Sequence, residues 1–255
     1  MIVSVINLTE GSLTDAQVQS AIRAVNRQVR EDFAPYWGFG GELRLEGKTG
    51  RRRLSVDPAD MRGDAILYLR NEVRVSDTDG FHAQWFRGIP YSVVYLKLSD
   101  LLKEAWTVTL SHEALELIGD AEANLLVQGP HPKHPSRKVY HWFEMCDAVQ
   151  DESYVIDGID VSNFVLPLYF TASAEHGGRN DFLGTRAQGR TLRSFSVNPG
   201  GYIGYFDPKT GKDEYYEMRG DTTAAHRLAV KRRLRTGRGM LRKRRAKIQM
   251  GRTSQ

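Results

Sequence analysis

A histidine and two glutamates stand at chemically useful spacings in the segment His112–Glu116, which has the sequence HEALE. In an α-helix, residues four positions apart project from one face, so His112 and Glu116 can present an imidazole nitrogen and a carboxylate oxygen to one cation. Both side chains are common Zn²⁺ ligands. Glu113 is rotated from His112 by about 100° around the helix, which points its carboxylate beside the cation. A general base that takes a proton from an activated water requires this position.

HEALE resembles the HExxH helix of zincin-type zinc metallopeptidases, with Glu116 in place of the second histidine. With Asp120 and a downstream Glu-x-Cys-Asp segment at residues 144–147, it is similar to poorly characterised metallopeptidases of microbes and phages. The resemblance implies a hydrolase of peptide bonds that uses Zn²⁺ as cofactor and Glu113 as general base. Glu116 replaces a neutral ligand by an anionic one, which lowers the Lewis acidity of the metal.

Two residues are candidates for the third metal ligand that the resemblance implies. Glu144 would be similar to the distant glutamate on a second helix in gluzincins, and it is the ligand that we favour. Glu122 lies ten residues after His112, which matches the spacing in metzincins with carboxylates in place of two histidines; Met145 could then take the place of their Met-turn. Glu144 is therefore the preferred third ligand, and Glu122 is an alternative to it.

Two aspartates add to the acidic cluster around the motif. Asp120 follows His112 by eight residues, about 12 Å along an uninterrupted helix, so it could reach the same ion only if Gly119 lets the chain turn back. With Glu144 as ligand, Asp120 and Asp147 would instead accept hydrogen bonds that orient His112 Nδ1–H or a neighbouring basic group. Because such a cluster needs a cation or shared protons at neutral pH, we expect a bound divalent ion.

The first half of the chain predicts a sheet and two long helices. Apolar runs or alternation predict strands at residues 2–8, 42–46, 64–70 and 91–97.

The first helix is predicted to begin at the cap residue Thr14 and to continue to Asp32, until Pro35 stops the pattern. The second is predicted as one continuous helix over residues 101–118, ending at Gly119. This order is similar to that of the N-terminal subdomain of zincins. It predicts an α+β fold with a mixed sheet, a backing helix and a motif-bearing helix.

The periodicity of apolar residues is weaker in the second half of the chain. A loop is predicted at 129–135, an aromatic segment that could be helical at 139–149, and hairpins at 154–167 and 198–218. We expect a zincin-like domain over residues 1–221, made of a sheet-and-helix subdomain (1–120) and an irregular C-terminal subdomain (121–221), followed by a basic tail (222–255).

Charge separates this tail from the body. Residues 1–221 hold 24 Lys and Arg against 31 Asp and Glu, whereas residues 222–255 hold 12 Lys and Arg and no acidic residue. The tail also has too few apolar residues to build a core. It is therefore expected to be separable from the body and to bind nucleic acid or another polyanion.

Compartment signals point to a protein of the cytoplasm or of a virion. Cys146 is the only cysteine, so an intrachain disulfide is excluded. The N-terminal segment does not resemble a signal peptide, and the sequence contains no apolar stretch of membrane-spanning length. We expect no contact with a membrane, and we expect Cys146 to be a small buried hydrophobic residue.

The remaining histidines and tyrosines are weaker candidates. His131 and His134 lie in HPKHP, where prolines favour an extended loop that does not converge on one ion. His141, between aromatic residues, is expected to be structural. Tyr154 and Tyr169 are tyrosines of the kind that stabilises an oxyanion in several zincins.

These observations favour a zinc metallopeptidase acting on a peptide or protein substrate. If residues 91–97 form the sheet edge, they could hold the substrate backbone by strand addition. The alternative is a non-catalytic structural or nucleic-acid-binding protein of a phage or mobile element that keeps a zincin-like fold.

Overall fold

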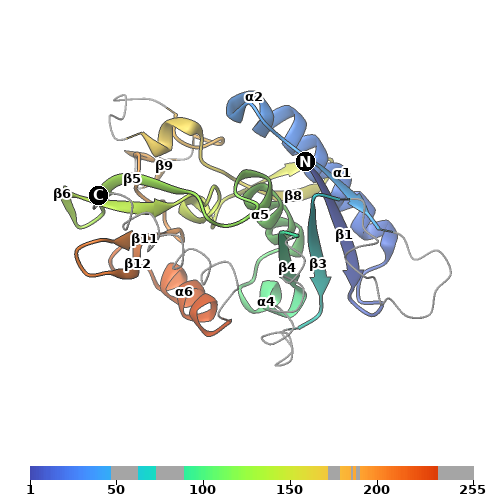
Figure 1. The fold of residues 1–255 in the computed structure, drawn as a ribbon. Coiled ribbons are helices and arrows are strands. Elements are labelled where there is room, and N and C mark those ends of the chain that lie inside the picture. The colour runs from blue at the N-terminus through green and yellow to red at the C-terminus, as the bar shows by residue number, and fades with distance from the viewer. Residues whose placement is uncertain (47–62, 73–88, 172–178, 185, 188–189, 235–255) are drawn as a thin grey trace. The chain divides into compact units, whose positions relative to one another are not determined.

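The computed structural model describes residues 1–46, 63–72, 89–171, 179–184, 186–187 and 190–234 (Figure 1). Contacts divide the chain into two units: Met1–Ala121 with Tyr154–Val161, and Glu122–Ser153 with Ser162–Gln255. Residues 154–161, which the sequence pattern assigned to the C-terminal subdomain, therefore belong to the first unit. The chain combines a parallel sheet with an antiparallel one, which is an α+β architecture.

The first unit is built on a four-stranded sheet of order β2-β1-β3-β4. The strands are β1 (Ile2–Leu8), β2 (Glu42–Leu45), β3 (Ala65–Arg70) and β4 (Tyr91–Tyr95). All described neighbours pair in parallel, and Val5 of β1 lies opposite Leu45 on one side and Leu67 on the other. We expected a mixed sheet, but the described strands of this sheet form no antiparallel pair. Parallel strands are covered on both faces, which explains why β1 and β3 are nearly continuous apolar runs.

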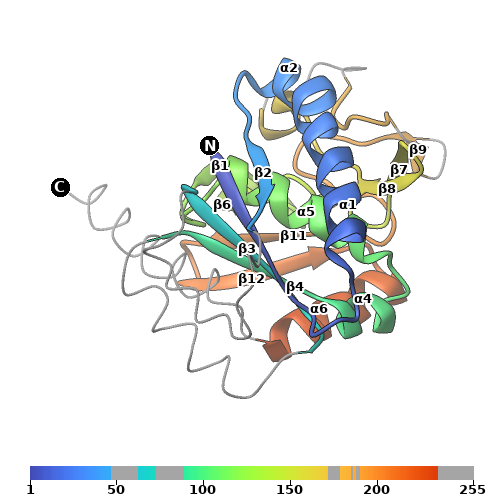
Figure 2. The same cartoon turned by 90° about the vertical axis from the view of Figure 1, so that its right-hand side faces the viewer.

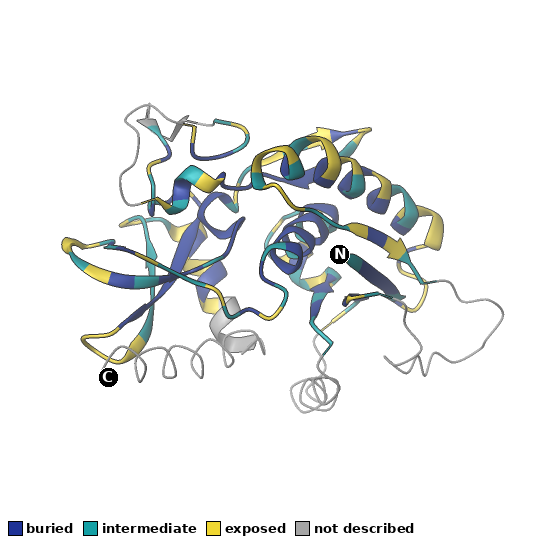
Figure 3. Ribbon diagram, turned by 45° about the horizontal axis from the view of Figure 1, so that its top comes forward, coloured by how far each residue is buried: buried dark blue, intermediate teal, exposed yellow. Residues whose placement is uncertain are grey.

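Two helices lie on one face of this sheet (Figure 2). Helix α1 (Asp15–Arg27) packs against β2, helix α5 (Trp106–Gly119) packs against β4 and β3, and the two helices also contact each other. The predicted N-cap is confirmed, because Thr14 and Gln17 form a reciprocal capping box. In Figure 3, α1 alternates between buried and exposed residues, whereas α5 is buried along almost its whole length.

Pro35 does not stop the first helix, contrary to our prediction. The chain continues from α1 through a π-helix, η1 (Gln28–Phe33), into a short helix, α2 (Ala34–Trp37). The Ala34 N–H donates to the Val29 carbonyl, five residues back. This wider turn lets the helix pass a proline, which has no N–H to donate and whose ring disfavours normal α-helical geometry. The helix ends at Gly38, which adopts the left-handed conformation with φ 73°.

The predicted helix over residues 101–118 is also interrupted. Residues Leu96–Leu101 form a separate helix, α4, and the motif helix α5 begins only at Trp106. Lys103, in the left-handed region with φ 54°, reverses the chain between them. No glycine or proline marks this break, so apolar spacing alone could not locate it.

A hairpin completes the described part of the first unit. Strands β7 (Ser153–Ile156) and β8 (Ile159–Ser162) pair with each other, as predicted. Asp157 and Gly158 connect them with φ values of 52° and 79°, the positive values that tight hairpin turns require.

The second unit contains an antiparallel sheet of order β12-β11-β6-β5. Its strands are β5 (Leu126–His131), β6 (His134–Trp142), β11 (Tyr202–Asp207) and β12 (Lys212–Glu217). Short elements complete the unit: the 3₁₀ helices η4 (Asp147–Val149) and η5 (Pro167–Phe170), the strand pair β9 (Arg186–Ala187) and β10 (Arg190–Thr191), and helix α6 (Thr222–Leu234).

Two predictions for this unit need correction. Residues 139–149 do not form one helix, because the segment up to Trp142 belongs to β6 and only Asp147–Val149 are helical. Alternating burial of β6 residues explains the difference, since its aromatic side chains pack on a sheet. The segment from His131 to His134 is a hairpin connection instead of an extended loop. The predicted hairpin of β11 and β12 is confirmed.

The start of the predicted tail is a packed helix. In α6, Ala224, Arg227 and Leu228 are buried, and the Arg227 guanidinium donates to Asp151 at 2.8 Å and to the Gly200 carbonyl at 3.2 Å. Residues 235–255 lie outside the described residues. Among the described helices, none combines the length and apolar character needed to cross a membrane.

Two truncations separate the packing role of α6 from the charge of the tail. Ending the chain after Leu234 removes 8 of the 12 basic tail residues and keeps α6, so affinity for duplex DNA should fall while the unfolding midpoint is retained. Ending it after Asp221 also removes buried Leu228, and should cost about 2 kcal/mol or more of stability. Salt-dependent DNA titration and urea unfolding measure the two effects. Equal DNA binding by both truncated chains and the full chain would show that the tail is not a nucleic-acid arm.

Candidate metal centre

The centre of the candidate site is a buried contact between His112 and Glu116 on α5. His112 Nε2 lies 3.2 Å from Glu116 Oε1, and the two side chains are only 5% and 3% exposed. Two ligand atoms bound about 2.1 Å from a tetrahedral ion lie about 3.4 Å apart. The predicted i, i+4 arrangement is therefore present, and its separation suits two ligands of one ion.

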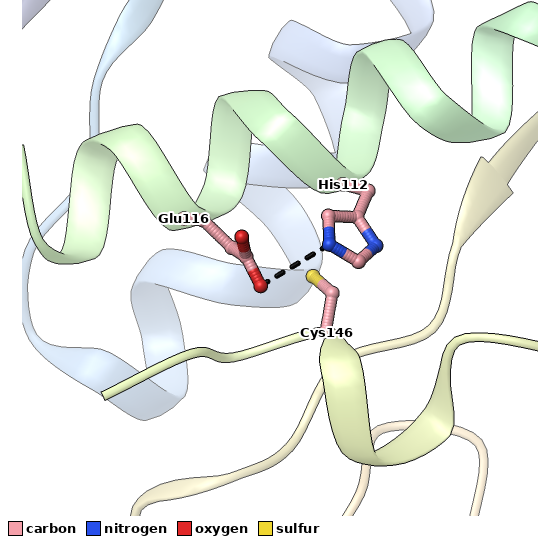
Figure 4. A group of neighbouring side chains, drawn as sticks. All are labelled: His112, Glu116 and Cys146. Atoms are coloured by element: carbon pink, nitrogen blue, oxygen red, sulfur yellow. Dashed lines mark ion pairs between the residues drawn. The ribbon is translucent and has the colours of Figure 1, made fainter. Parts of the chain in front are cut away.

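Cys146 is the third member of this group (Figure 4). One donor atom each from His112, Glu116 and Cys146 lie within 4.8 Å of one another, and all three residues are buried. A nitrogen, an oxygen and a sulfur donor form a set that suits Zn²⁺, a borderline-soft ion, and not Mg²⁺ or Ca²⁺, which prefer oxygen ligands alone. A buried group that could hold a metal ion is thus present in the chain.

Burial makes a cation at this group physically reasonable. A carboxylate in an apolar environment is costly unless it is paired. A protonated histidine could pair with Glu116 alone, whereas a divalent ion satisfies the imidazole, the carboxylate and a thiolate together. The donors present therefore fit the zinc ion that the resemblance implies.

Glu113 is held beside this group by the sheet. It is half-buried on α5, and Ser92 of β4 donates a hydrogen bond from its hydroxyl to Glu113 Oε2. Ser92 is itself buried and pairs with Leu67 across the β3–β4 ladder. The sheet thus fixes one oxygen of the carboxylate that the sequence assigns as general base.

Asp120 and Glu122, the nearest acidic residues in sequence, lie in different environments. Asp120 is the C-cap of α5, is buried, and donates its N–H to the Glu116 carbonyl at 2.8 Å. Glu122 is exposed and accepts a hydrogen bond from Asn124 at 2.6 Å. Helix α5 continues to Gly119 without turning back. The roles of Asp120 and Glu122 as metal ligands or hydrogen-bond acceptors stay predictions.

Glu144 and Asp147 are buried residues of the second unit. They line a small cavity together with His141, Trp142 and Tyr169. Burial raises the pKa of Tyr169, and the charge of Asp147 adds to that shift. The roles of Glu144 as third metal ligand and of Asp147 as hydrogen-bond acceptor stay predictions. Cys146 is now a second candidate for the third ligand.

The weaker candidates His131 and His141 make hydrogen bonds to the backbone of their own hairpin. His131 Nδ1 accepts the Lys133 N–H at 3.0 Å, and burial lowers the pKa of His131. His141 Nε2 lies 2.8 Å from the Pro130 carbonyl, to which it donates, and burial lowers its pKa to about 4. His141 is thus a buried residue with a structural contact, as predicted. The hydroxyl of Tyr154 donates to Asp32 at 2.7 Å.

Cys146 is the candidate ligand that the sequence pattern did not single out. Its burial is confirmed, but its proximity to His112 and Glu116 was not predicted. The available signal was the Glu-x-Cys-Asp segment itself, because Cys, Asp and Glu side chains can each bind zinc.

Comparison of the chain with protein-family models, with curated proteins and with solved structures found no match.

The identity of the third ligand can be tested with cobalt. Co²⁺ bound to a thiolate has an intense sulfur-to-metal charge-transfer band, so the wild type should show this band and Cys146→Ser should lose it. Glu144→Gln should keep both the band and the metal affinity, because its carboxylate is not needed. Near-ultraviolet and visible absorption titrations measure both properties. A wild-type spectrum without the band, combined with metal loss in Glu144→Gln, would favour Glu144 as the ligand instead.

Proposed function

We propose that this chain is a zinc-dependent hydrolase of peptide bonds. The observation that carries the proposal is the buried His112–Glu116 pair one helical turn apart, with Glu113 on the same helix. This combination supplies ligands and a general base from five consecutive residues. The strand and helix order of the first unit supports a zincin-like arrangement of the motif helix against a sheet.

His112, Glu116 and Cys146 would hold the ion. Three protein ligands leave one position of a tetrahedral site for water or substrate, as catalytic zinc sites require. A zinc ion bound there would supply Lewis acidity for the scissile carbonyl and for a water nucleophile. A carboxylate and a thiolate together neutralise the charge of the ion, so we expect slower hydrolysis than with neutral imidazole ligands.

Glu113 would take the proton of the attacking water and pass it to the leaving amine. The Ser92 hydroxyl donates to Glu113 Oε2 and fixes the direction of the carboxylate. We assign the proton transfer to the other oxygen, Oε1.

Strand β4 is the part of the sheet best suited to bind a substrate backbone. Within the described sheet it is an edge strand that pairs with β3, and its Ser92 is bonded to Glu113. An extended peptide that adds to a sheet edge makes main-chain hydrogen bonds with little dependence on its side chains. The proposed substrate class is therefore an extended segment of a peptide or protein.

The basic tail supports nucleic-acid binding as an accompanying or alternative function. Residues 222–255 carry 12 basic residues and no acidic one, which favours contacts with phosphates. A non-catalytic protein of a phage or mobile element would need nucleic-acid binding but no peptide hydrolysis.

Glu113→Gln separates chemistry from metal binding. The variant should lose hydrolysis of fluorescein-labelled casein by about 10²-fold or more while keeping its zinc content, because the residue is assigned as base and not as ligand. Glu72→Gln is the matched control, since Glu72 is an exposed glutamate of the first unit paired with Lys97. Fluorescence assays and elemental analysis measure the two properties. Full activity in the Glu113→Gln protein would contradict the mechanism.

A further inference from the structure

A chain of hydrogen-bonded polar side chains runs through the interior of the first unit. The Ser111 hydroxyl on α5 donates to Gln28 Oε1 at 2.6 Å. Gln28 Nε2 donates to the Tyr154 hydroxyl at 3.2 Å, and that hydroxyl donates to Asp32 Oδ2 at 2.7 Å. The motif helix is thereby bonded to the π-helix η1 and to strand β7.

Gln28 is an unusual residue to find at the middle of this chain. Its side chain is completely buried, as is that of Ser111, and it is the first residue of η1. The neighbouring positions that face inward are apolar, including Val25 and Val29. Buried polar pairs in an apolar contact fix one relative placement of two elements, since any shift breaks the bond and leaves polar atoms in an apolar environment.

The contacts of Ser111 and Glu113 lie on either side of His112 in sequence. Ser111 is bonded to Gln28, and Glu113 is bonded to Ser92 of β4. Residues 111 and 113 point in directions about 160° apart around the helix. The two bonds therefore resist rotation of α5 about its own axis at the level of His112.

Rotation of α5 keeps His112 and Glu116 together but moves both relative to a ligand from another segment. Side-chain tips lie about 5–6 Å from a helix axis, so a rotation of about 10° moves a donor atom by about 1 Å. Metal–ligand distances tolerate deviations of about 0.2 Å. The helix must therefore be held to within a few degrees, and apolar packing alone is less specific than a directional hydrogen bond.

From this geometry we infer that Gln28 is a positioning residue for the metal centre. By accepting a hydrogen bond from the Ser111 hydroxyl, Gln28 sets the rotation of α5 at which His112 and Glu116 face the third ligand of the ion. The inference rests on the proposed metal site, and it gives the π-helix η1 a role in positioning that site.

The two single variants and the double variant distinguish positioning from simple stabilisation. Gln28→Met and Ser111→Ala each remove one partner of a buried bond, so each should lower the unfolding midpoint and raise the Kd for Co²⁺ about 10-fold. The double variant leaves neither partner of this bond unpaired, so its stability should recover in part, although the bond from Gln28 Nε2 to Tyr154 stays broken. Its Co²⁺ affinity and its altered visible spectrum should not recover, because the directional contact is still missing.

Asn26→Ala is the matched control. Asn26 lies on α1, two residues before Gln28, and holds the Leu43 backbone of β2 through both of its amide atoms, at 2.9 and 2.7 Å. Its loss should destabilise the same unit while leaving the Co²⁺ spectrum and Kd unchanged.

Each outcome decides the inference. Unchanged Co²⁺ affinity in both single variants, or an affinity that recovers with stability in the double variant, would overturn the positioning role while leaving the metal site intact. A wild type that binds no Co²⁺ would overturn both this inference and the proposed function.

Discussion

The rest of the first unit depends on one constraint: two ionisable side chains must be held on a helix that is buried along almost its whole length. His112 and Glu116 are 5% and 3% exposed, so neither can rely on water to stabilise its charge. Helix α5 meets this constraint by placing them one turn apart and by packing against β3 and β4. The parallel sheet provides the apolar surface, and Ser92 and Gln28 provide the directional contacts beside the pair.

The chemistry of the donors narrows what this pair can do. An imidazole, a carboxylate and a thiol in one buried group form a mixed set with one soft donor, which suits zinc better than the ions that bind oxygen alone. Glu113 is half-buried and differs from Glu116 in being bonded to a hydroxyl on the sheet. Adjacent carboxylates on one helix thus receive different environments, which is how a single short motif can supply both a ligand and a base.

The sequence predicted the elements whose signals are local. Apolar runs located β1 and β3, and the Thr14 cap located α1. The spacing of His112 and Glu116 also predicted their contact, because helical geometry fixes it. The π-helix before Pro35, the chain reversal at Lys103 and the buried Gln28 were not predicted. The burial of Gln28 involves a contact with the distant Ser111. Cys146 was missed for the same reason, since spacing cannot show which residues far along the chain approach the motif.

The most direct test of the central claim is the metal content of the purified full-length chain. Elemental analysis of the wild type should find about one zinc per chain, and the His112→Ala, Glu116→Ala double variant should retain none. His226→Ala, which removes an exposed histidine of α6, should bind as the wild type does. Equal zinc content in the wild type and the double variant would contradict a metal centre on α5.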